Sequence, residues 1–320
     1  MKVIGVGTAA VDYFLKVDES FLKEFYLKPE DDVSFFSKNI KPKDMLKKAR
    51  IFKKSTGGMS LNTIAILSKF KVLVSHFSNF GKGEGEEYLF KNLPLVDTSK
   101  VLKTGDTHIC FCLLTKNGKE RTFVYRENKK ELDLFKKVDY KYLNSSDLIY
   151  ITPIYLNDPL RSLEKIIKII EKIKTPKISF TPGVFFTNLG LKKLKPIIKK
   201  TEILFLNKRE IKTLTGLSKK KGSRKLTDLG TKIVVCTLGE KGVLITTKKE
   251  QLLVSAKKIK KVVDSTGSGD AFAAGFIYGY LKKKSLKESA EIGNKIAALS
   301  LSDYGLGWLN KIKPNFLNSL

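Results

Sequence analysis

A short turn over residues 264–270, DSTGSGD, carries glycines and small hydroxyl residues between a pair of aspartates. It leads directly into residues 271–280, AFAAGFIYGY, whose apolar composition is typical of a buried helix. Backbone N–H groups at a helix start are unpaired and the helix dipole is positive there, so such a turn binds anions. Gly267 and Gly269 let the backbone approach a phosphate without a Cβ in the way. Asp270 is then placed to take a proton from an incoming hydroxyl group.

The same turn has a simpler interpretation, because aspartate and threonine are common helix caps. In that case Asp264, Thr266 or Asp270 only starts the helix. Three other stretches favour the anion site, and their order along the chain is more specific than any one of them. They are GGMSLN at 57–62 before a helix, NKRE at 207–210 after a strand, and TLGEKG at 237–242 between strands.

The rest of the chain alternates strand-like and helix-like segments, as a doubly wound α/β sheet requires. Strand-like runs cover residues 3–7, 72–77, 148–151, 177–180, 203–206, 233–237, 243–247 and 259–263. Helix-like runs cover residues 61–69, 86–92, 162–173, 191–199, 271–282 and 286–301. The short links predict a mostly parallel sheet with helices on both faces. No Pro/Gly/Ser-rich linker divides the chain, so we expect one domain over residues 1–320.

Two segments interrupt this alternation, at about residues 14–36 and 107–125. The second predicts a hairpin, because HICFCLLT is followed by an Asn-Gly turn at Lys116–Lys119 and then by ERTFVY. Inserted strands of this kind pair with each other outside the main sheet and cover a site at its carboxyl edge. We therefore expect a small β-lid, with a surface hairpin of no function as the alternative.

The charge of the chain raises the question of a nucleic-acid partner, since 61 Lys+Arg against 32 Asp+Glu give a formal +29. Lysine carries nearly all of this charge, whereas base and phosphate recognition favours the arginine fork. The lysines are also spread along the chain without a separate basic tail. A solvated, lysine-rich surface is the favoured interpretation, and no nucleic-acid partner is expected.

The cysteines and the N-terminal sequence indicate the cellular compartment in which the protein is expected. Cys110, Cys112 and Cys236 lack metal-type spacing, and we expect Cys110 and Cys112 to pack on a strand face instead of serving as ligands or nucleophiles. The chain runs from Met1 straight into a strand, and no apolar run is long enough to span a bilayer. These features predict a cytoplasmic protein without a membrane partner.

Together, these motifs resemble the PfkB, or ribokinase-like, family of sugar and nucleoside kinases from Val3 to about Leu301. DSTGSGD resembles the family signature D-T-x-G-x-G-D, with Ser265 beside Thr266. The absence of a GxxxxGK[ST] loop agrees, because these kinases hold ATP without one. The resemblance implies a ribokinase-like fold and transfer of the ATP γ-phosphate to a hydroxyl group, with Mg²⁺ and, as an option, a monovalent cation such as K⁺.

The resemblance also implies a role for each residue of the turn and of the acceptor side. Asp270 is similar to the general base that deprotonates the acceptor hydroxyl. The amides of Gly267, Ser268 and Gly269 resemble the anion hole for the γ-phosphate. The carboxylate that accepts hydrogen bonds from sugar hydroxyls corresponds to Asp12, beside Gly57, Gly58 and Asn62. A plain turn residue is the alternative for Asp12.

On the ATP side, Asn207 and Glu210 resemble the family's N-x-x-E, which organises Mg²⁺ and phosphates largely through water, and a strand-end cap is the alternative. Asn294 is similar to a residue near the adenine, with a solvent-facing asparagine as the alternative. The nucleotide-side turn of the family corresponds to Thr237, Gly239 and Gly242, for which a hairpin is the alternative.

The acceptor is less clearly indicated. The stretch that follows Asp12, together with KERTFVY and YITPIYLNDP, resembles the adenosine-kinase-like branch, in which a nucleoside 5′-hydroxyl is phosphorylated. Tyr125-Arg126 instead resembles a pair that some sugar-acid kinases direct at their substrate. Thr181 stands where related patterns have aspartate, and GKGEGEE departs from the branch's G-x-D-x-x-G. We expect a nucleoside or ribose-type acceptor, with another sugar or a sugar acid as the alternative.

Other classes of protein stay open. A nucleic-acid-binding protein on a kinase scaffold is motivated by the charge, and a catalytically dead regulator is a further hypothesis. The intact DSTGSGD and NKRE stretches argue against both. Because lid strands in this family often pair between subunits, the resemblance also leaves open a homodimer through the lid.

Overall fold

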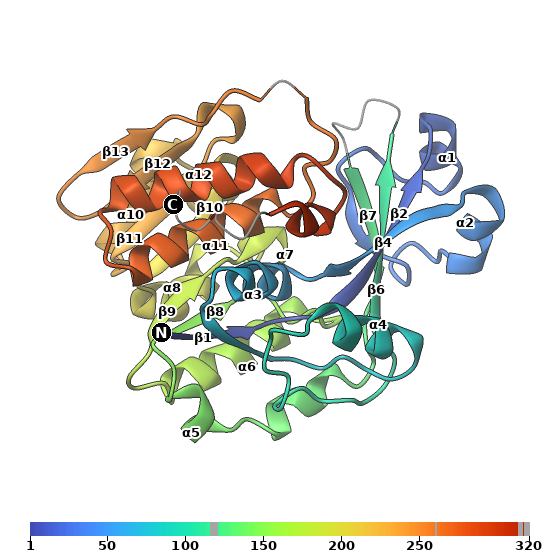
Figure 1. Cartoon of the computed structure of the whole chain (residues 1–320), viewed down its shortest axis with the longest axis horizontal. Helices are drawn as coiled ribbons and strands as arrows, with labels where there is room; N and C mark the ends of the chain where they lie inside the picture. The colour runs from blue at the N-terminus through green and yellow to red at the C-terminus, as the bar shows by residue number, and fades with distance from the viewer. Residues whose placement is uncertain (116–120, 260, 313–315, 317–320) are drawn as a thin grey trace.

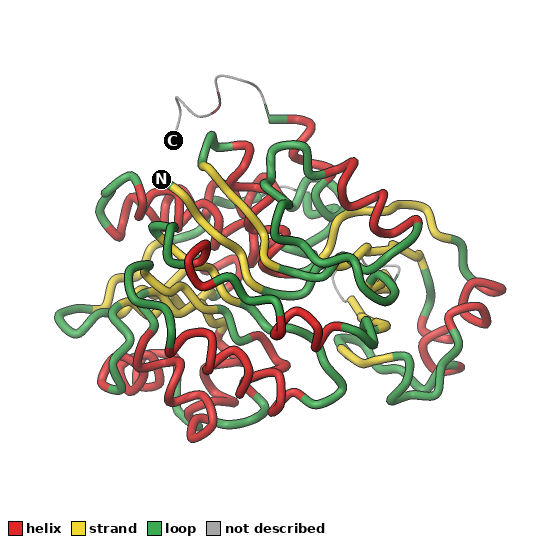
Figure 2. The backbone as a smooth tube through the Cα atoms, turned by 90° about the horizontal axis from the view of Figure 1, so that it is seen from below, coloured by secondary structure: helices red, strands yellow, loops and turns green. Residues whose placement is uncertain are grey.

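The computed structural model describes residues 1–115, 121–259, 261–312 and 316, and it contains an eight-stranded and a five-stranded β-sheet. Figure 1 shows the larger sheet among helices, with the smaller sheet projecting from one side. Figure 2, a view turned by 90°, shows strands of the larger sheet between helices. In the part of the chain that is described, no helix is long and apolar enough to cross a membrane.

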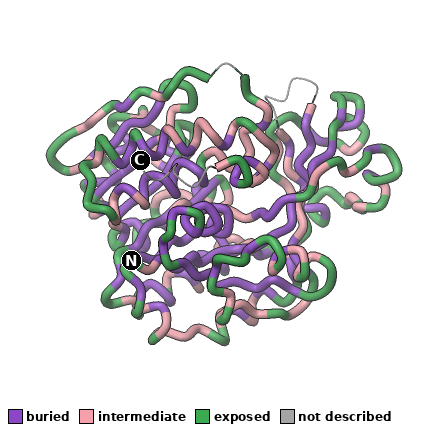
Figure 3. Tube along the Cα trace, viewed as in Figure 1, coloured by how far each residue is buried: buried purple, intermediate pink, exposed green. Residues whose placement is uncertain are grey.

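The larger sheet, called the main sheet below, is parallel from β5 to β11 and ends in two antiparallel strands. Its strands are nearly all buried, as Figure 3 shows, which explains their apolar runs. In spatial order they are β13 (Gln251–Val254), β12 (Val243–Thr246), β11 (Ile233–Thr237), β10 (Ile203–Asn207), β9 (Lys177–Phe180), β8 (Leu148–Ile151), β1 (Lys2–Val6) and β5 (Leu73–Phe77).

Helices cover both faces of the main sheet, so the prediction of a doubly wound α/β fold is confirmed. One apolar core joins the sheet to α3 (Met59–Lys69), α4 (Glu84–Asn92), α11 (Ser268–Leu281) and α12 (Leu286–Ser300). A second core joins its other face to α5 (Tyr140–Leu143), α6 (Pro159–Glu171), α7 (Gly183–Thr187), α8 (Leu191–Lys200), α9 (Lys208–Thr215) and α10 (Lys219–Asp228). Short 3₁₀ helices occur at η1 (Glu131–Lys136), η2 (Gly239–Lys241) and η3 (Gly307–Lys311).

The smaller sheet is the lid sheet, and it has a core of its own. Its strands in spatial order are β3 (Asp32–Ser34), β7 (Arg121–Arg126), β6 (His108–Leu114), β2 (Ala10–Lys16) and β4 (Ile51–Gly57). The helices α1 (Glu19–Glu24) and α2 (Pro42–Lys48) belong to the same unit, and Phe21 and Met45 pack with residues of β2, β6 and β7. The expected Lys116–Lys119 turn lies outside the described residues.

Two sequence expectations differ from the structure. The run expected as a strand at 259–263 contains no strand among its described residues, since Val263 makes one backbone bond, to Leu301, instead of a ladder. The lid sheet also extends beyond residues 14–36, because β2 starts at Ala10 and β4 covers residues 51–57. The sequence of β4, IFKKSTG, was not recognised as a strand because of its two lysines. The segment forms a strand through antiparallel pairing with β2.

Candidate active site

One row of lid side chains faces the main sheet. In the strand register Asp12 lies opposite Ser55 on one side and Cys110 on the other, and Cys110 lies opposite Tyr125. Opposed residues share a face of the sheet. The residues next to them in sequence, Tyr13, Phe111 and Val124, pack in the lid core with α1 and α2. The row Ser55–Asp12–Cys110–Tyr125, called the lid row, therefore points the other way, toward the main sheet.

The two adjacent glycines of the sequence make room for Asp12. A Cβ built on Gly57 would lie only 1.9 Å from Oδ1 of Asp12. Gly58 has φ +98°, and a Cβ there would lie 2.1 Å from the carbonyl oxygen of Thr8. Both positions therefore require glycine, and they set the start of α3 directly beside the Asp12 carboxylate.

Asp270 lies in the first turn of α11 and is only 8% exposed. Nδ2 of Asn62 donates a 3.0 Å hydrogen bond to its Oδ2, and Thr63 Oγ1 donates to its backbone carbonyl oxygen at 3.2 Å. Burial raises the pKa of Asp270 to about 7, and the Asn62 bond opposes that rise. A carboxylate with a pKa near neutrality suits general-base chemistry. Asn62 thus orients Asp270, while its own Oδ1 is buried without a partner.

Asp12 is the second buried carboxylate of the site, at 7% exposure. Burial raises its pKa well above the ordinary value, and the charges of Asp270 and Asp264 raise it further. No hydrogen bond from the described residues reaches its carboxylate. Because a buried carboxylate without a partner is costly, this group is suited to accept hydrogen bonds from a ligand.

Asp264 holds the glycine turn in shape. Its Oδ1 accepts bonds from the amide and the hydroxyl of Thr266, at 2.9 and 2.7 Å, and its Oδ2 accepts from the amide of Gly305 at 3.1 Å. Its carboxylate is therefore used within the chain, but it does not cap α11, whose N-cap is Gly267 without a side-chain cap bond. Asp270 does not share that role, because its side chain bonds to Asn62 in another helix.

The amides of the turn differ in what they can still bind. The Ser268 amide donates to the Ser265 carbonyl oxygen at 3.2 Å. Those of Gly267 and Gly269 make no hydrogen bond within the described chain. A Cβ on Gly269 would meet no atom within 4 Å, so open space lies beside the helix start. That space, with unpaired amides and the helix dipole, is suited to an anion.

On the opposite face of the main sheet from α11, Asn207 and Glu210 form a capping box at the start of α9. Oε2 of Glu210 accepts a 2.8 Å bond from the Asn207 amide, so the strand-end cap is present. Burial raises the pKa of Glu210. Its Oε1 takes no bond from the described chain, which leaves it available to a hydrated cation.

The remaining residues of the expected ATP side lie around the ends of β11 and β13. Thr237 ends β11 and Gly239 starts η2, with φ +62°. A Cβ on Gly242 would lie 2.0 Å from the Val254 carbonyl oxygen, so this turn must contain glycine. Asn294 is 8% exposed and donates a 3.0 Å bond to the Ser255 carbonyl oxygen. The solvent-facing alternative for Asn294 is therefore wrong.

Sequence reasoning did not identify an aromatic cluster at the carboxyl edge of the main sheet. The rings of Tyr125 and Tyr155 are 5.2 Å apart, and those of Tyr155 and Phe185 are 4.6 Å apart. Tyr155 follows β8 and Phe185 lies in α7, after β9, so both stand where doubly wound sheets bind ligands. All three side chains are half-buried. The sequence feature that could have identified Tyr155 and Phe185 is their position just after strands that were predicted to be parallel.

Arg121 was also missed as a site residue. Its position on β7, four residues before Tyr125, gives it the same face of the lid sheet as the lid row. Its Nε is buried without a partner. Burial lowers the pKa of Arg121, and the charge of Asp264 opposes this change. An arginine stays protonated in such a setting, so the lid carries a positive charge close enough to interact with the carboxylate of Asp264.

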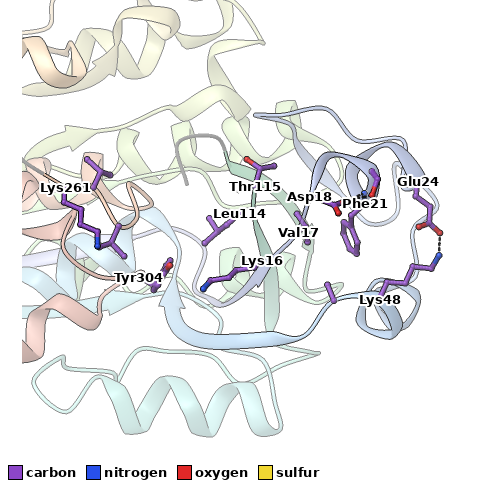
Figure 4. Close-up of a pocket in the computed structure, with 14 residues that line it drawn as sticks. Lys16, Val17, Asp18, Phe21, Glu24, Lys48, Leu114, Thr115, Lys261 and Tyr304 are labelled. Atoms are coloured by element: carbon purple, nitrogen blue, oxygen red, sulfur yellow. Dashed lines mark hydrogen bonds and ion pairs between the residues drawn. The ribbon is translucent and has the colours of Figure 1, made fainter. Parts of the chain in front are cut away.

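A cavity of about 830 Å³ opens between the outer end of the lid and the segment before Asp264. Figure 4 shows Lys16 and Leu114 on the lid side and Lys261 and Tyr304 opposite. None of the residues expected at the active site lines it. The buried carboxylate of Asp12 lies nearer the start of β2 than Lys16, which lines this cavity at the strand's other end.

The ribokinase-like α/β fold, closed by a lid and carrying a buried carboxylate at a glycine-rich helix start, defines a kinase of small molecules. Comparison with known proteins supports this class. The family model for pfkB family carbohydrate kinases matches residues 29–311, so the chain belongs to the pfkB family and is a phosphotransferase.

Individual relatives carry both sugar and nucleoside names. The chain is 36% identical over 171 residues to an uncharacterized sugar kinase of Archaeoglobus fulgidus, a match that covers 53% of this chain and 67% of that protein. It is 33% identical over 170 residues to a cytidine kinase of Thermococcus kodakarensis, covering 52% of this chain and 58% of that protein. The adenosine kinase of Anopheles gambiae has the same fold, with a TM-score of 0.83, 18% identity and 98% coverage of each chain.

Proposed function

We propose that the chain is an ATP-dependent kinase that phosphorylates a hydroxymethyl group of a nucleoside or another ribose-type acceptor. The observation that carries this proposal is the pair of buried carboxylates, Asp12 on the lid and Asp270 at the start of α11, which lie close enough for the charge of Asp270 to raise the pKa of Asp12. One is suited to hold the acceptor and the other to activate it.

Asp270 takes the proton of the acceptor hydroxyl while that oxygen attacks the γ-phosphorus. Its pKa of about 7 lets it be ionised at neutral pH and still accept a proton readily. Asn62 keeps Oδ2 in place. The Asp12 carboxylate accepts hydrogen bonds from the other hydroxyls of the acceptor, which orients the attacking oxygen.

Charge on the transferred group is stabilised by the α11 start. The amides of Gly267 and Gly269 make no hydrogen bond within the described chain and are suited to bind an anion. Arg121 adds a positive charge from the lid. Membership of the family implies ATP and generally Mg²⁺, which neutralises phosphate charge when bound. Glu210 would hold it through water, and ATP would lie along Asn207, Thr237, Gly239, Gly242 and Asn294. Dependence on K⁺ stays a prediction.

The aromatic cluster Tyr125–Tyr155–Phe185 favours a nucleoside over a free sugar. Tyr125 belongs to the lid row, two strands from Asp12 in the same register. An acceptor whose sugar reaches Asp12 therefore extends its other end toward these rings. A nucleobase stacks on such rings, whereas a free sugar or a sugar acid leaves them without a partner. The name of the cytidine kinase relative agrees with this preference.

The test is a substrate panel with Mg·ATP in which ADP release is followed. Adenosine, cytidine, inosine, ribose, fructose 6-phosphate and a keto sugar acid cover the alternatives. We expect turnover on a nucleoside at least tenfold more efficient than on ribose. Turnover only on a sugar or sugar acid would retain the chemistry and overturn the acceptor, and silence across the panel together with salt-sensitive retention on DNA would favour a nucleic-acid-binding protein.

Two further predictions concern the surroundings of the enzyme. The lid sheet has two edge strands, β3 and β4, and an open edge is suited to pair with a second copy. A homodimer through the lid is therefore proposed, with sedimentation of the purified chain as its test. A cytoplasmic location also stays a prediction.

A further inference from the structure

A second group of chemically reactive side chains lies in the lid row and just beyond it. Cys110 and Cys112 occupy alternate positions of β6, so both side chains leave the same face of the sheet. Asp12 on β2 pairs directly with Cys110. The ligand atoms of the three residues, the two Sγ atoms and a carboxylate oxygen, all lie within 4.8 Å of one another.

The surroundings of this cluster are dry. Cys112 is fully buried, Cys110 half-buried and Asp12 7% exposed. Cys112 packs with Phe14 and Leu114, with the ring of Phe123 against them. As no hydrogen bond from the described chain reaches Asp12, its carboxylate is available to a ligand. Apolar packing explains Cys112, and the Asp12 carboxylate, which the proposed acceptor would occupy, is free to bind a cation beside the two thiols when no acceptor is bound.

The donor set selects a type of ion. Two sulfur ligands and one carboxylate suit Zn²⁺ or Cd²⁺, whereas Mg²⁺ requires oxygen ligands. In a tetrahedral zinc site, sulfur ligands about 2.3 Å from the metal lie roughly 3.8 Å apart. The ligand atoms of the cluster lie within 4.8 Å of one another, a separation comparable to that spacing. The nearby carboxylates Asp264 and Asp270 add to the attraction for a cation.

We propose that Asp12, Cys110 and Cys112 form a binding site for a thiophilic divalent cation such as Zn²⁺. A water molecule would be the fourth ligand. Each thiol releases its proton to solvent as its sulfur binds the metal. An occupied site removes Asp12 from the acceptor hydroxyls, so the metal inhibits the kinase in competition with the acceptor. The inhibition rests on the proposed function, but the binding does not.

The binding test is a titration of the full chain with Cd²⁺ in a buffer that contains Mg²⁺, following the ultraviolet absorbance of cadmium–thiolate bonds. We expect one equivalent to bind to the wild type and to Cys236→Ser, whose altered thiol lies in the main sheet. Cys110→Ser, a change at a half-buried position, should weaken binding at least tenfold, and Cys110→Ser with Cys112→Ser should abolish the absorbance.

Equal absorbance in the wild type and the double variant, or no absorbance in a wild type with three free thiols, would overturn the site. A second assay measures ADP release with and without Zn²⁺. We expect inhibition that a chelator reverses, that excess acceptor relieves and that Cys110→Ser reduces at least tenfold. Cadmium binding without kinase turnover would contradict the proposed function and leave the metal site intact, whereas zinc inhibition that is unchanged in Cys110→Ser would overturn the inhibitory role.

Discussion

The main sheet and the lid sheet hold their functional groups in different ways. In the main sheet, backbone geometry does most of the positioning: α11 begins at a glycine with φ +72°, and a capping box fixes the start of α9. In the lid, the register of paired strands sets which side chains share a row. Groups positioned by the backbone of the main sheet suit phosphoryl transfer, which is the reaction common to the family. Side chains that share a row of the lid sheet can be substituted without a change in strand pairing, and they suit selection of the acceptor.

The two regions meet at a pair of carboxylates. Burial raises the pKa of both Asp12 and Asp270, and the charge of Asp270 raises the pKa of Asp12 further. The account therefore predicts that changes on the main sheet reduce the rate of transfer, while changes on the lid alter the use of the acceptor.

The largest effect is expected for Asp270→Asn. Removal of a general base costs on the order of 10²–10⁴-fold in turnover. ATP binding should stay intact, because the side chain lies on the acceptor side of the glycine turn and bonds to Asn62. ADP release and nucleotide affinity are measured together, with the exposed Asp228→Asn as the matched control. Full turnover of the Asn variant would remove Asp270 from the mechanism.

A change in the backbone of the main sheet should come next. Gly269→Ala adds a methyl group to a position where no atom lies within 4 Å and φ is not positive, so the fold accepts it. The methyl group occupies the space assigned to the γ-phosphate, and we expect turnover to fall about 10²-fold. Thermal unfolding serves as the control. If activity survives at an unchanged unfolding midpoint, the phosphate does not bind at this turn.

Asp12→Asn tests the lid. Hydrogen bonds to a charged group contribute about 1.5–3 kcal/mol, so the KM for the acceptor should rise roughly 10- to 100-fold. The KM for ATP should change little, because Asp12 lies on β2 of the lid. Glu19→Gln, an exposed carboxylate on α1 of the lid, is the matched control. Equal rises in the KM values for the acceptor and for ATP would contradict the assignment of acceptor binding to the lid sheet alone.

The smallest effect concerns stability and has a defined sign. Folded Asp270 has a pKa of about 7 against an ordinary value of 3.8, so the folded state binds a proton that the unfolded state releases between these pH values. Stability from this group is therefore present at low pH and is lost as pH rises through about 7. Asp270→Asn should unfold at a higher temperature than the wild type at pH 8, and the difference should shrink toward pH 4. A constant difference would contradict the raised pKa.

Sequence predicted the main sheet better than the lid. β8 and β9 lie at the predicted residues. A strand that is buried on both faces has a continuous apolar sequence, which can be recognised without knowledge of its neighbours. β4 was missed, since its adjacent lysines Lys53 and Lys54 interrupt the alternation of apolar and polar residues, and its strand character comes from pairing with β2. Residues 259–263 have the composition of a strand but pair with no neighbour along their described part.

The site shows the same division. The glycine turn, with Asp270 at its end, was visible in the sequence because local helix-start geometry has a local pattern. Tyr155, Phe185 and Arg121 carry no motif, and they join the site only through tertiary contacts. The burial of Asn294 likewise depends on Ser255, a residue 39 positions away.

The pH dependence of kcat/KM for the acceptor, measured in the wild type and in Asn62→Ala, tests the role of Asp270 most directly. The wild type should lose activity on acidification with an apparent pKa of about 7. The Asn62 bond lowers the pKa of Asp270, so its removal should shift this acid limb to higher pH. A limb that belongs to ATP or to the acceptor would not move. An acid limb at the same pH in both proteins would contradict the assignment of Asp270 as the base.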